Sequence, residues 1–242
     1  MYFAQYDLLE KLSKEKHWKF IEVRPDGVVS LASQLFKQVE RLTPLEPHAD
    51  AFQQSGFVPS NNAMNLAQSL ALFLSFYAFH EGPGANVPYP GPPAAFSSRY
   101  TNVSQTTLAH FQIYSSLQPK FDNGEIYNIG DEDDGVSWEQ LWPDLTSHFG
   151  LVGTGPDESF NISSYMNEHK SEWTNWVQKH GLKEGAIEAT DFGFVSMLMR
   201  MAVFDRRYDL GKARSIGFVE NKRTAEGYFE AFELMREAKI IP

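Results

Sequence analysis

The first 28 residues show two hydrophobic patterns in succession. Hydrophobic side chains recur at helical spacing across residues 2–12, with charged side chains on the opposite face, which predicts an amphipathic helix. Residues 18–23 (WKFIEV) then form a short run rich in β-branched and aromatic side chains, and Pro25 and Gly27 end it. We therefore expect a helix, then a buried strand, then a loop over residues 24–28.

This loop at residues 24–28 is a candidate binding site because of its position. In open α/β sheets, ligands bind just beyond the carboxyl ends of the strands. An ordinary helix–strand unit that binds nothing explains the same pattern about as well, so position alone does not decide between the two.

The part of the chain after Gly56 is predicted to be one helix-rich mixed domain. Helical patterns cover residues 60–79, 104–117, 162–180, 190–203 and 224–238, and Ser137 is placed to cap another helix. A strand is expected at residues 125–129, an extended segment at 87–90 and a turn at 153–156. Residues 66–79 are apolar on nearly every face, which is typical of a helix buried in a core.

Composition narrows the class of protein. The chain has 242 residues, of which 42% are hydrophobic, enough for a sizeable core. Its formal charge of −10 offers little to neutralise phosphates, so we expect no nucleic-acid partner and no anionic membrane surface. The sequence contains no cysteine, which fits a reducing, cytoplasmic setting, and its longest apolar run is too short to span a bilayer.

Motifs for metal or phosphate binding are not evident. The seven histidines lack the spacing of paired ligands on one helix, so no metal site is expected. Residues 131–134 are acidic but lack the alternating ligands of a calcium loop, and we expect a solvated loop there. No glycine-rich dinucleotide-binding turn follows any predicted strand.

Several segments, by their order and spacing, resemble one family. The matching text is WKFIEVRPD at residues 18–26, GFVPSNNAMNL at 56–66, residues 124–130 followed by Ser137-Trp138 and Leu141-Trp142, and the ending KIIP. These segments resemble extended short-chain dehydrogenases/reductases, and more narrowly the progesterone 5β-reductase/iridoid synthase-like (PRISE-like) group in its fungal form. The resemblance implies an α/β fold, the C-terminal part of a Rossmann-type fold with a helix-rich substrate domain and a remnant of the parallel sheet.

The resemblance also implies an activity, an NADPH-dependent reduction of the activated C=C bond of a small enone or enal. Tyr2 would be catalytic, donating a hydrogen bond to the substrate carbonyl, because a phenol aimed at a developing oxyanion stabilises it. Pro25, Gly27, Val28 and Phe57 would lie against the cofactor. Without the resemblance, Tyr2 is explained more simply as an aromatic residue near a fraying chain start.

One residue departs from the usual pattern of these enzymes. A lysine normally follows the tyrosine by four positions, and Tyr6 stands there. In the resembling group a lysine from an earlier strand replaces it, and this sequence has no counterpart of that strand or of the nucleotide-binding half. We therefore expect residues 1–28 to be a remnant of the NAD(P)-binding domain, residues 55–242 to be the substrate-binding domain, and the chain to be an inactive C-terminal fragment.

Residues 29–54 interrupt the resemblance. Their hydrophobic stripe predicts a surface helix followed by a proline-containing loop. Removing them joins RPDGV to SGFVPSNN, which matches the spacing of the family, and the flanking codons can match splice sites. We hypothesise a retained intron, which transcript reads continuous across residues 29–54 would contradict.

Two other functions stay open. A non-catalytic protein could keep the substrate-domain fold and serve as a binding or interaction module. A sugar-nucleotide epimerase or dehydratase of the same superfamily, NAD-dependent, is the other alternative, and Tyr6 and the aromatic-rich segments count against it. The sequence does not predict the oligomeric state.

Overall fold

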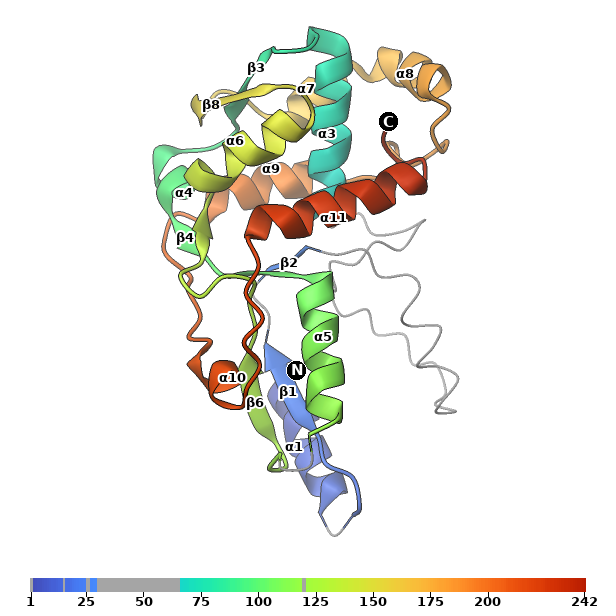
Figure 1. Cartoon of the computed structure of the whole chain (residues 1–242). Helices are drawn as coiled ribbons and strands as arrows, with labels where there is room; N and C mark the ends of the chain where they lie inside the picture. Colours follow the sequence, from blue (N-terminus) through green and yellow to red (C-terminus); the bar gives the residue numbers. More distant parts are fainter. Residues whose placement is uncertain (1, 15, 25–26, 30–65, 119–120) are drawn as a thin grey trace.

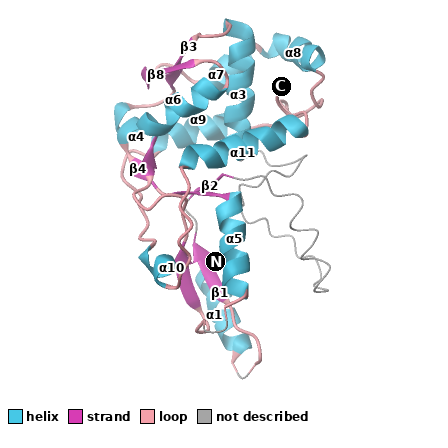
Figure 2. Cartoon of the chain, viewed as in Figure 1, coloured by secondary structure: helices cyan, strands magenta, loops and turns pink. Residues whose placement is uncertain are grey.

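The computed structural model describes residues 2–14, 16–24, 27–29, 66–118 and 121–242. In Figure 1 these residues form a small lower body and a larger, mainly helical upper body, with β2 between them. Figure 2 shows that helices dominate and that the strands are short. The strands of the described residues form four two-stranded sheets, three parallel and one antiparallel.

The lower body is built around one parallel pair of strands. β1 (Ile21–Arg24) pairs with β6 (Glu125–Asn128), and α1 (Tyr2–Ser13), α5 (Gln105–Ser116) and α10 (Gly211–Ser215) surround the pair (Figure 1). The strand expected at residues 18–23 therefore exists but begins at Ile21. β6 supplies a parallel neighbour on one side of this strand.

Helix α1 is anchored to the amino end of this strand pair. The Tyr6 hydroxyl donates to the Gly124 carbonyl at 2.9 Å, and the Tyr6 ring meets Phe20 edge-on. The Asn123 side chain donates to the Ser13 hydroxyl at 2.6 Å. The amphipathic pattern predicted for this helix is present, but its leucines remain exposed, with Leu8 at 54%, Leu9 at 41% and Leu12 at 50%.

The segment between the two bodies is a strand and not the predicted loop. Gly27 and Val28 were expected in a loop, but they lie in β2 (Gly27–Val29), which pairs in parallel with β5 (Asn102–Ser104). Two consecutive valines favour extended backbone, and the partner strand supplies the hydrogen bonds that such a short strand needs.

The upper body packs helices around α3 (Leu66–Glu81). Every residue from Ala67 to Tyr77 is buried, as the all-round apolar pattern predicts. Around it lie α4 (Pro93–Ser97), α6 (Trp138–His148), α7 (Ile162–Glu168), α8 (Trp173–His180), α9 (Phe192–Met201) and α11 (Thr224–Glu237). Two sheets complete this body, β3 (Asn86–Tyr89) with β8 (Val152–Pro156) and β4 (Arg99–Tyr100) with β7 (Val136–Ser137).

Two elements of the upper body differ from the sequence prediction. Residues 162–180 were expected as one helix, but α7 ends before His169 and a short 3-10 helix, Lys170–Glu172, separates it from α8. No glycine or proline marks this break in the sequence. Residues 153–156 were expected as a turn, but they belong to β8 because β3 lies alongside and pairs with them.

Two of the predicted helix starts are confirmed by their caps, whereas α9 begins at Phe192, two residues after the predicted start. The Ser104 hydroxyl accepts from the Thr107 amide at the start of α5, and Ser137 forms a capping box with Gln140 at the start of α6. Of the insertion hypothesised at residues 29–54, the structure describes only Val29, which ends β2. The first residues of the helix expected at 60–79 also lie outside the described part. None of the helices that the structure describes is long and apolar enough to cross a membrane.

Candidate active site at the strand ends

The carboxyl ends of β1 and β6 meet at one edge of the lower body. Arg24 is opposite Asn128, and the Ile129 amide donates to the Arg24 carbonyl at 3.5 Å. The Asn128 side chain donates to the Asp209 carbonyl at 3.2 Å, which brings the segment after α9 to the same edge. In open α/β sheets this edge is where ligands bind, so it is the candidate active site.

The structure describes only some of the predicted site residues. Tyr2 is the first residue of α1, and Gly27 and Val28 lie in β2. Pro25 and Phe57 fall outside the described residues. The contacts of Tyr2 and of Phe57 with a cofactor or substrate therefore stay predictions.

Tyr6 has a packing role at the position where these enzymes usually carry a lysine. Its hydroxyl donates to the Gly124 backbone and its ring packs on Phe20, at the amino end of β6. A side chain held there is not available to assist Tyr2.

A buried carboxyl group lies beneath β5, close to the candidate site. Asp131 is fully buried, although residues 131–134 were expected as a solvated loop, and only Asp133 and Asp134 are exposed. The Ser104 hydroxyl donates to Asp131 Oδ1 at 2.9 Å, and the Asp131 amide donates to the Asn102 carbonyl at 2.7 Å. The loop turns inward because these β5 groups bind its first residue.

Burial controls the protonation of Asp131. Removal from water raises the pKa of this carboxyl to about 6, against the opposing effect of hydrogen bonds from Ser104 and Thr107. Burial also raises the pKa of the neighbouring Tyr228 phenol, and the Asp131 charge adds to that effect. Because Asp131 has no exposed surface, it acts as a positioning residue for β5, the partner of β2.

Helix α11 approaches this centre closely at a glycine. A Cβ added at Gly227 would lie 2.7 Å from the Ser104 Cβ and 3.5 Å from Asp131 Oδ2. Any larger residue would push α11 away from β5. The contact between α11 and the β2–β5 pair therefore depends on the absence of a side chain at this position.

The residues present do not form a phosphate site for a dinucleotide. The sequence contains no G-x-G-x-x-G turn, and in the described part β5 passes directly into α5 at Ser104 and Gln105 without a glycine. The Ser104 hydroxyl already caps the first turn of α5. This part of the chain therefore does not fit the pyrophosphate of a nicotinamide dinucleotide, and we derive no step through that cofactor.

Two further features lie in the upper body, apart from the strand ends. A shallow groove of about 350 Å³ has aromatic walls and cationic side chains, including Phe79, Trp176, Lys179 and Arg236. Among the described residues, one group of three could hold a metal ion: His80, His169 and Glu172. Sequence reasoning missed this group because its members come from separate elements, with His80 and Glu172 separated by 92 positions in the sequence.

The parallel strand pairs with flanking helices define an α/β protein of the Rossmann type. A family model described as PRISE-like Rossmann-fold domain matches residues 46–242. The chain therefore belongs to the PRISE-like family, as the sequence motifs predict.

Curated relatives agree with this assignment. The chain is 27% identical to the short chain dehydrogenase sirQ of Leptosphaeria maculans, covering 100% of this chain and 55% of that protein. It is 29% identical to the short chain dehydrogenase ausT of Aspergillus calidoustus, covering 100% of this chain and 53% of that protein. It is 30% identical to the short chain dehydrogenase sirS of L. maculans, covering 100% of this chain and 56% of that protein. The chain thus spans about half the length of the curated relatives it matches.

Proposed function

We propose that this chain is the substrate-side part of an NADPH-dependent reductase of activated C=C bonds, with a small enone or enal as substrate. Membership of the PRISE-like family and similarity to short chain dehydrogenases support an oxidoreductase with a nicotinamide nucleotide and a small-molecule substrate. The observation that supports the proposal most is the parallel strand edge, where Arg24 and Asn128 end together.

In this proposal Tyr2 acts on the carbonyl group of the substrate. Its phenol donates a hydrogen bond to the carbonyl oxygen, which becomes negative as the conjugated carbon is reduced. Tyr6 keeps α1 in place through its bond to Gly124, so it orients the helix that carries Tyr2. Asp131 does not touch the substrate in this proposal. It holds β5 in place through its bond from Ser104.

The segment after α9 is the proposed wall for the apolar body of the substrate. Met201, the last residue of α9, is 65% exposed, and Val203 and Phe204 after it are 49% and 62% exposed. The same segment continues to Asp209, whose carbonyl binds Asn128 at the strand edge. Apolar side chains beside the site would favour a small hydrophobic enone over a sugar nucleotide.

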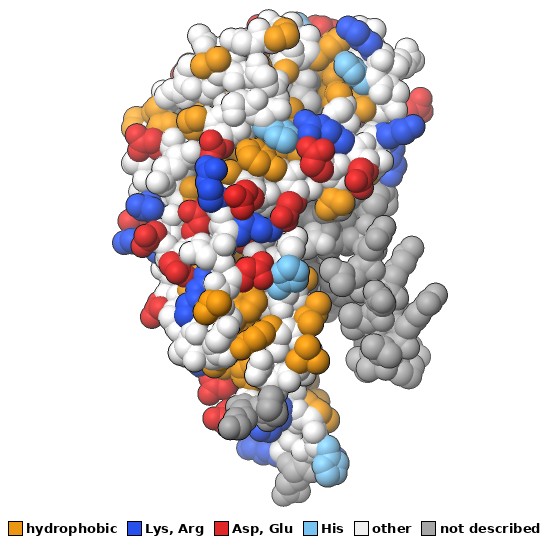
Figure 3. Space-filling view, viewed as in Figure 1, with side chains coloured by type: hydrophobic (Ala, Val, Ile, Leu, Met, Phe, Trp, Pro, Cys, Tyr) orange, Lys and Arg blue, Asp and Glu red, His pale blue; other side chains and the backbone are white. Residues whose placement is uncertain are grey.

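The lower body exposes apolar side chains, which supports the proposal that another part of the whole protein covers them. Besides the leucines of α1, Ile113 and Leu117 on α5 are 52% and 76% exposed. Figure 3 shows hydrophobic side chains gathered on this lower part of the molecule. We propose that a dinucleotide-binding half covers such surface in the whole protein, and that these 242 residues alone do not catalyse.

The proposal predicts a large effect of Tyr2→Phe on turnover. In a longer protein that contains this sequence and a dinucleotide-binding half, enone-dependent oxidation of NADPH should fall about 100-fold or more, because one oxyanion donor is worth roughly 3 kcal/mol. Tyr6→Phe is the matched control. It removes the hydroxyl bonded to Gly124 but keeps the ring contact with Phe20, which still holds α1, so it should lower stability by about 1 kcal/mol and leave turnover nearly unchanged. Equal turnover of Tyr2→Phe and wild type would refute the role of Tyr2.

A non-catalytic interaction module is the second candidate. The exposed leucines of α1 favour it as well, because an apolar helix face is a docking surface for any partner. This alternative would be favoured if a longer protein folds and binds NADPH but none of the enones tested supports oxidation of the NADPH.

A further inference from the structure

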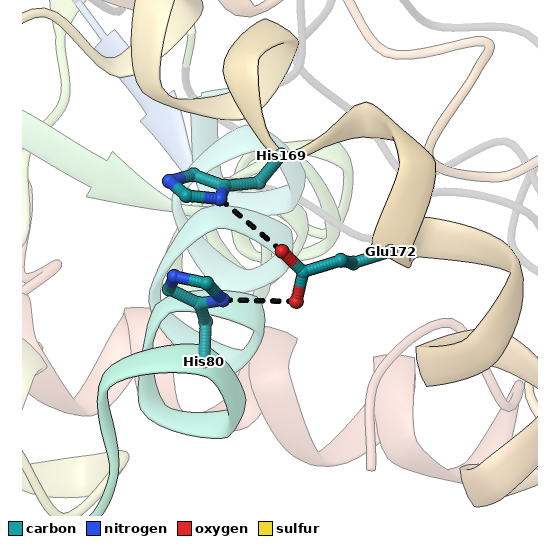
Figure 4. Close-up of side chains that lie close together, drawn as sticks. All are labelled: His80, His169 and Glu172. Atoms are coloured by element: carbon teal, nitrogen blue, oxygen red, sulfur yellow. Dashed lines mark hydrogen bonds and ion pairs between the residues drawn. The ribbon is translucent and has the colours of Figure 1, made fainter.

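Two histidines and a glutamate converge at the outer end of α3 (Figure 4). His80 lies in the last turn of α3, His169 directly follows α7, and Glu172 belongs to the short 3-10 helix between α7 and α8. His80 Nδ1 lies 3.0 Å from Glu172 Oε2, and His169 Nδ1 lies 3.3 Å from Glu172 Oε1. One ligand atom from each residue lies within 4.8 Å of the other two.

These separations suit a small tetrahedral ion. Zinc binds imidazole nitrogen and carboxylate oxygen at about 2.0–2.2 Å, so neighbouring ligand atoms in a tetrahedral site are about 3.4 Å apart. The two Nδ1 atoms lie 3.0 and 3.3 Å from Glu172, each hydrogen-bonded to a different carboxylate oxygen, so one ion between the three side chains could replace both hydrogen bonds. The two imidazole rings are adjacent, with centroids 4.0 Å apart.

The surroundings of the cluster favour a cation. Glu81 Oε1 lies 3.7 Å from His80 Nε2, which adds a second carboxylate beside the histidines. The carboxyl end of the 16-residue helix α3, where His80 lies, carries the negative end of the helix dipole. Two carboxylates and the negative end of a helix dipole together attract a divalent cation.

Neighbouring side chains hold the histidine rings in position. The Tyr165 ring contacts His169 with centroids 4.6 Å apart, and its hydroxyl donates to Glu81 at 2.9 Å. The Phe76 ring stacks on His80. Such second contacts fix the orientation of metal ligands. The side chains of His80 and His169 are 26% and 25% exposed, so an ion can enter from solvent and retain a water molecule.

We propose that His80, His169 and Glu172 bind one Zn²⁺ ion, with water in the fourth position. The ion ties the end of α3 to the break between α7 and α8, so its role is to stabilise the upper body. The site is separate from the strand ends and does not depend on the proposed reductase activity.

The test is zinc binding to the tag-free chain, measured by calorimetry and by metal content after dialysis. We expect one zinc per chain and a rise in melting temperature when zinc is added to chelator-treated protein. Glu172→Gln and His169→Asn should each weaken zinc binding 100-fold or more and abolish that rise.

His110→Asn is the matched control. His110 Nδ1 lies 2.9 Å from Glu220 Oε2, a histidine–glutamate pair that has no third ligand among the described residues, so this variant should bind zinc like wild type. The proposal is overturned if wild type binds no zinc, or if Glu172→Gln and His169→Asn bind it as tightly as wild type and His110→Asn do.

Discussion

At the level of single residues, burial changes the acid–base chemistry of Asp131. The side chain is fully buried, one carboxyl oxygen accepts from Ser104, and desolvation raises the pKa to about 6. The folded state therefore favours the protonated carboxyl over the ionised one. Because the pKa of an unfolded aspartate is lower, burial of Asp131 stabilises the fold at acidic pH, and this contribution is lost as the pH rises through 6.

Asp131→Asn should remove this pH dependence, because asparagine keeps the acceptor for Ser104 and carries no charge. The free energy of unfolding of the variant, relative to wild type, should increase by roughly 2 kcal/mol between pH 4 and 6 and level off above about pH 7. Urea unfolding at several pH values measures the difference. Parallel pH profiles for the two proteins would contradict this, because they would show that ionisation of Asp131 does not destabilise the folded state.

At the level of secondary structure, strong local signals predicted the helices well. The apolar run in α3, the Ser104 and Ser137 caps and the pattern of α11 all depend on neighbouring residues, so the sequence contains them. The short strands β2 and β8 were missed because their extended backbone depends on partners distant in sequence.

Contacts between residues distant in sequence also limited the prediction of the sites. The burial of Asp131 depends on β5 and α11, and the His80–Glu172 contact joins segments 92 residues apart. Neither has a local signature. The strand-end site was predictable as a position, because helix–strand order alone indicates where β1 ends.

Helix α6 offers a test of the cap signal. Ser137→Ala should lower the free energy of unfolding by about 1 kcal/mol, because the Ser137 hydroxyl accepts from the Gln140 amide at the start of the helix. Ser147→Ala, near the other end of α6, removes an exposed hydroxyl that donates to the Asp144 carbonyl and should change stability by less than about 0.5 kcal/mol. Thermal or urea unfolding compares the two variants, and equal losses would contradict the capping role.

At the level of the whole molecule, the two bodies have unequal cores. The upper body contains a large hydrophobic cluster around α3, whereas the cluster of the lower body is small and is formed around Phe111 and Tyr127. The lower body also exposes the leucines of α1. This asymmetry is expected if a dinucleotide-binding half completes the lower body in the whole protein.

Binding of NADPH tests this account most directly. The tag-free 242-residue chain, shown to be folded by circular dichroism, is titrated with NADPH and compared with a longer protein that includes a glycine-rich dinucleotide-binding turn. The account predicts no saturable binding to the chain at micromolar NADPH and micromolar affinity in the longer protein. A micromolar dissociation constant for the 242-residue chain would contradict it, because the cofactor site would then lie within these residues.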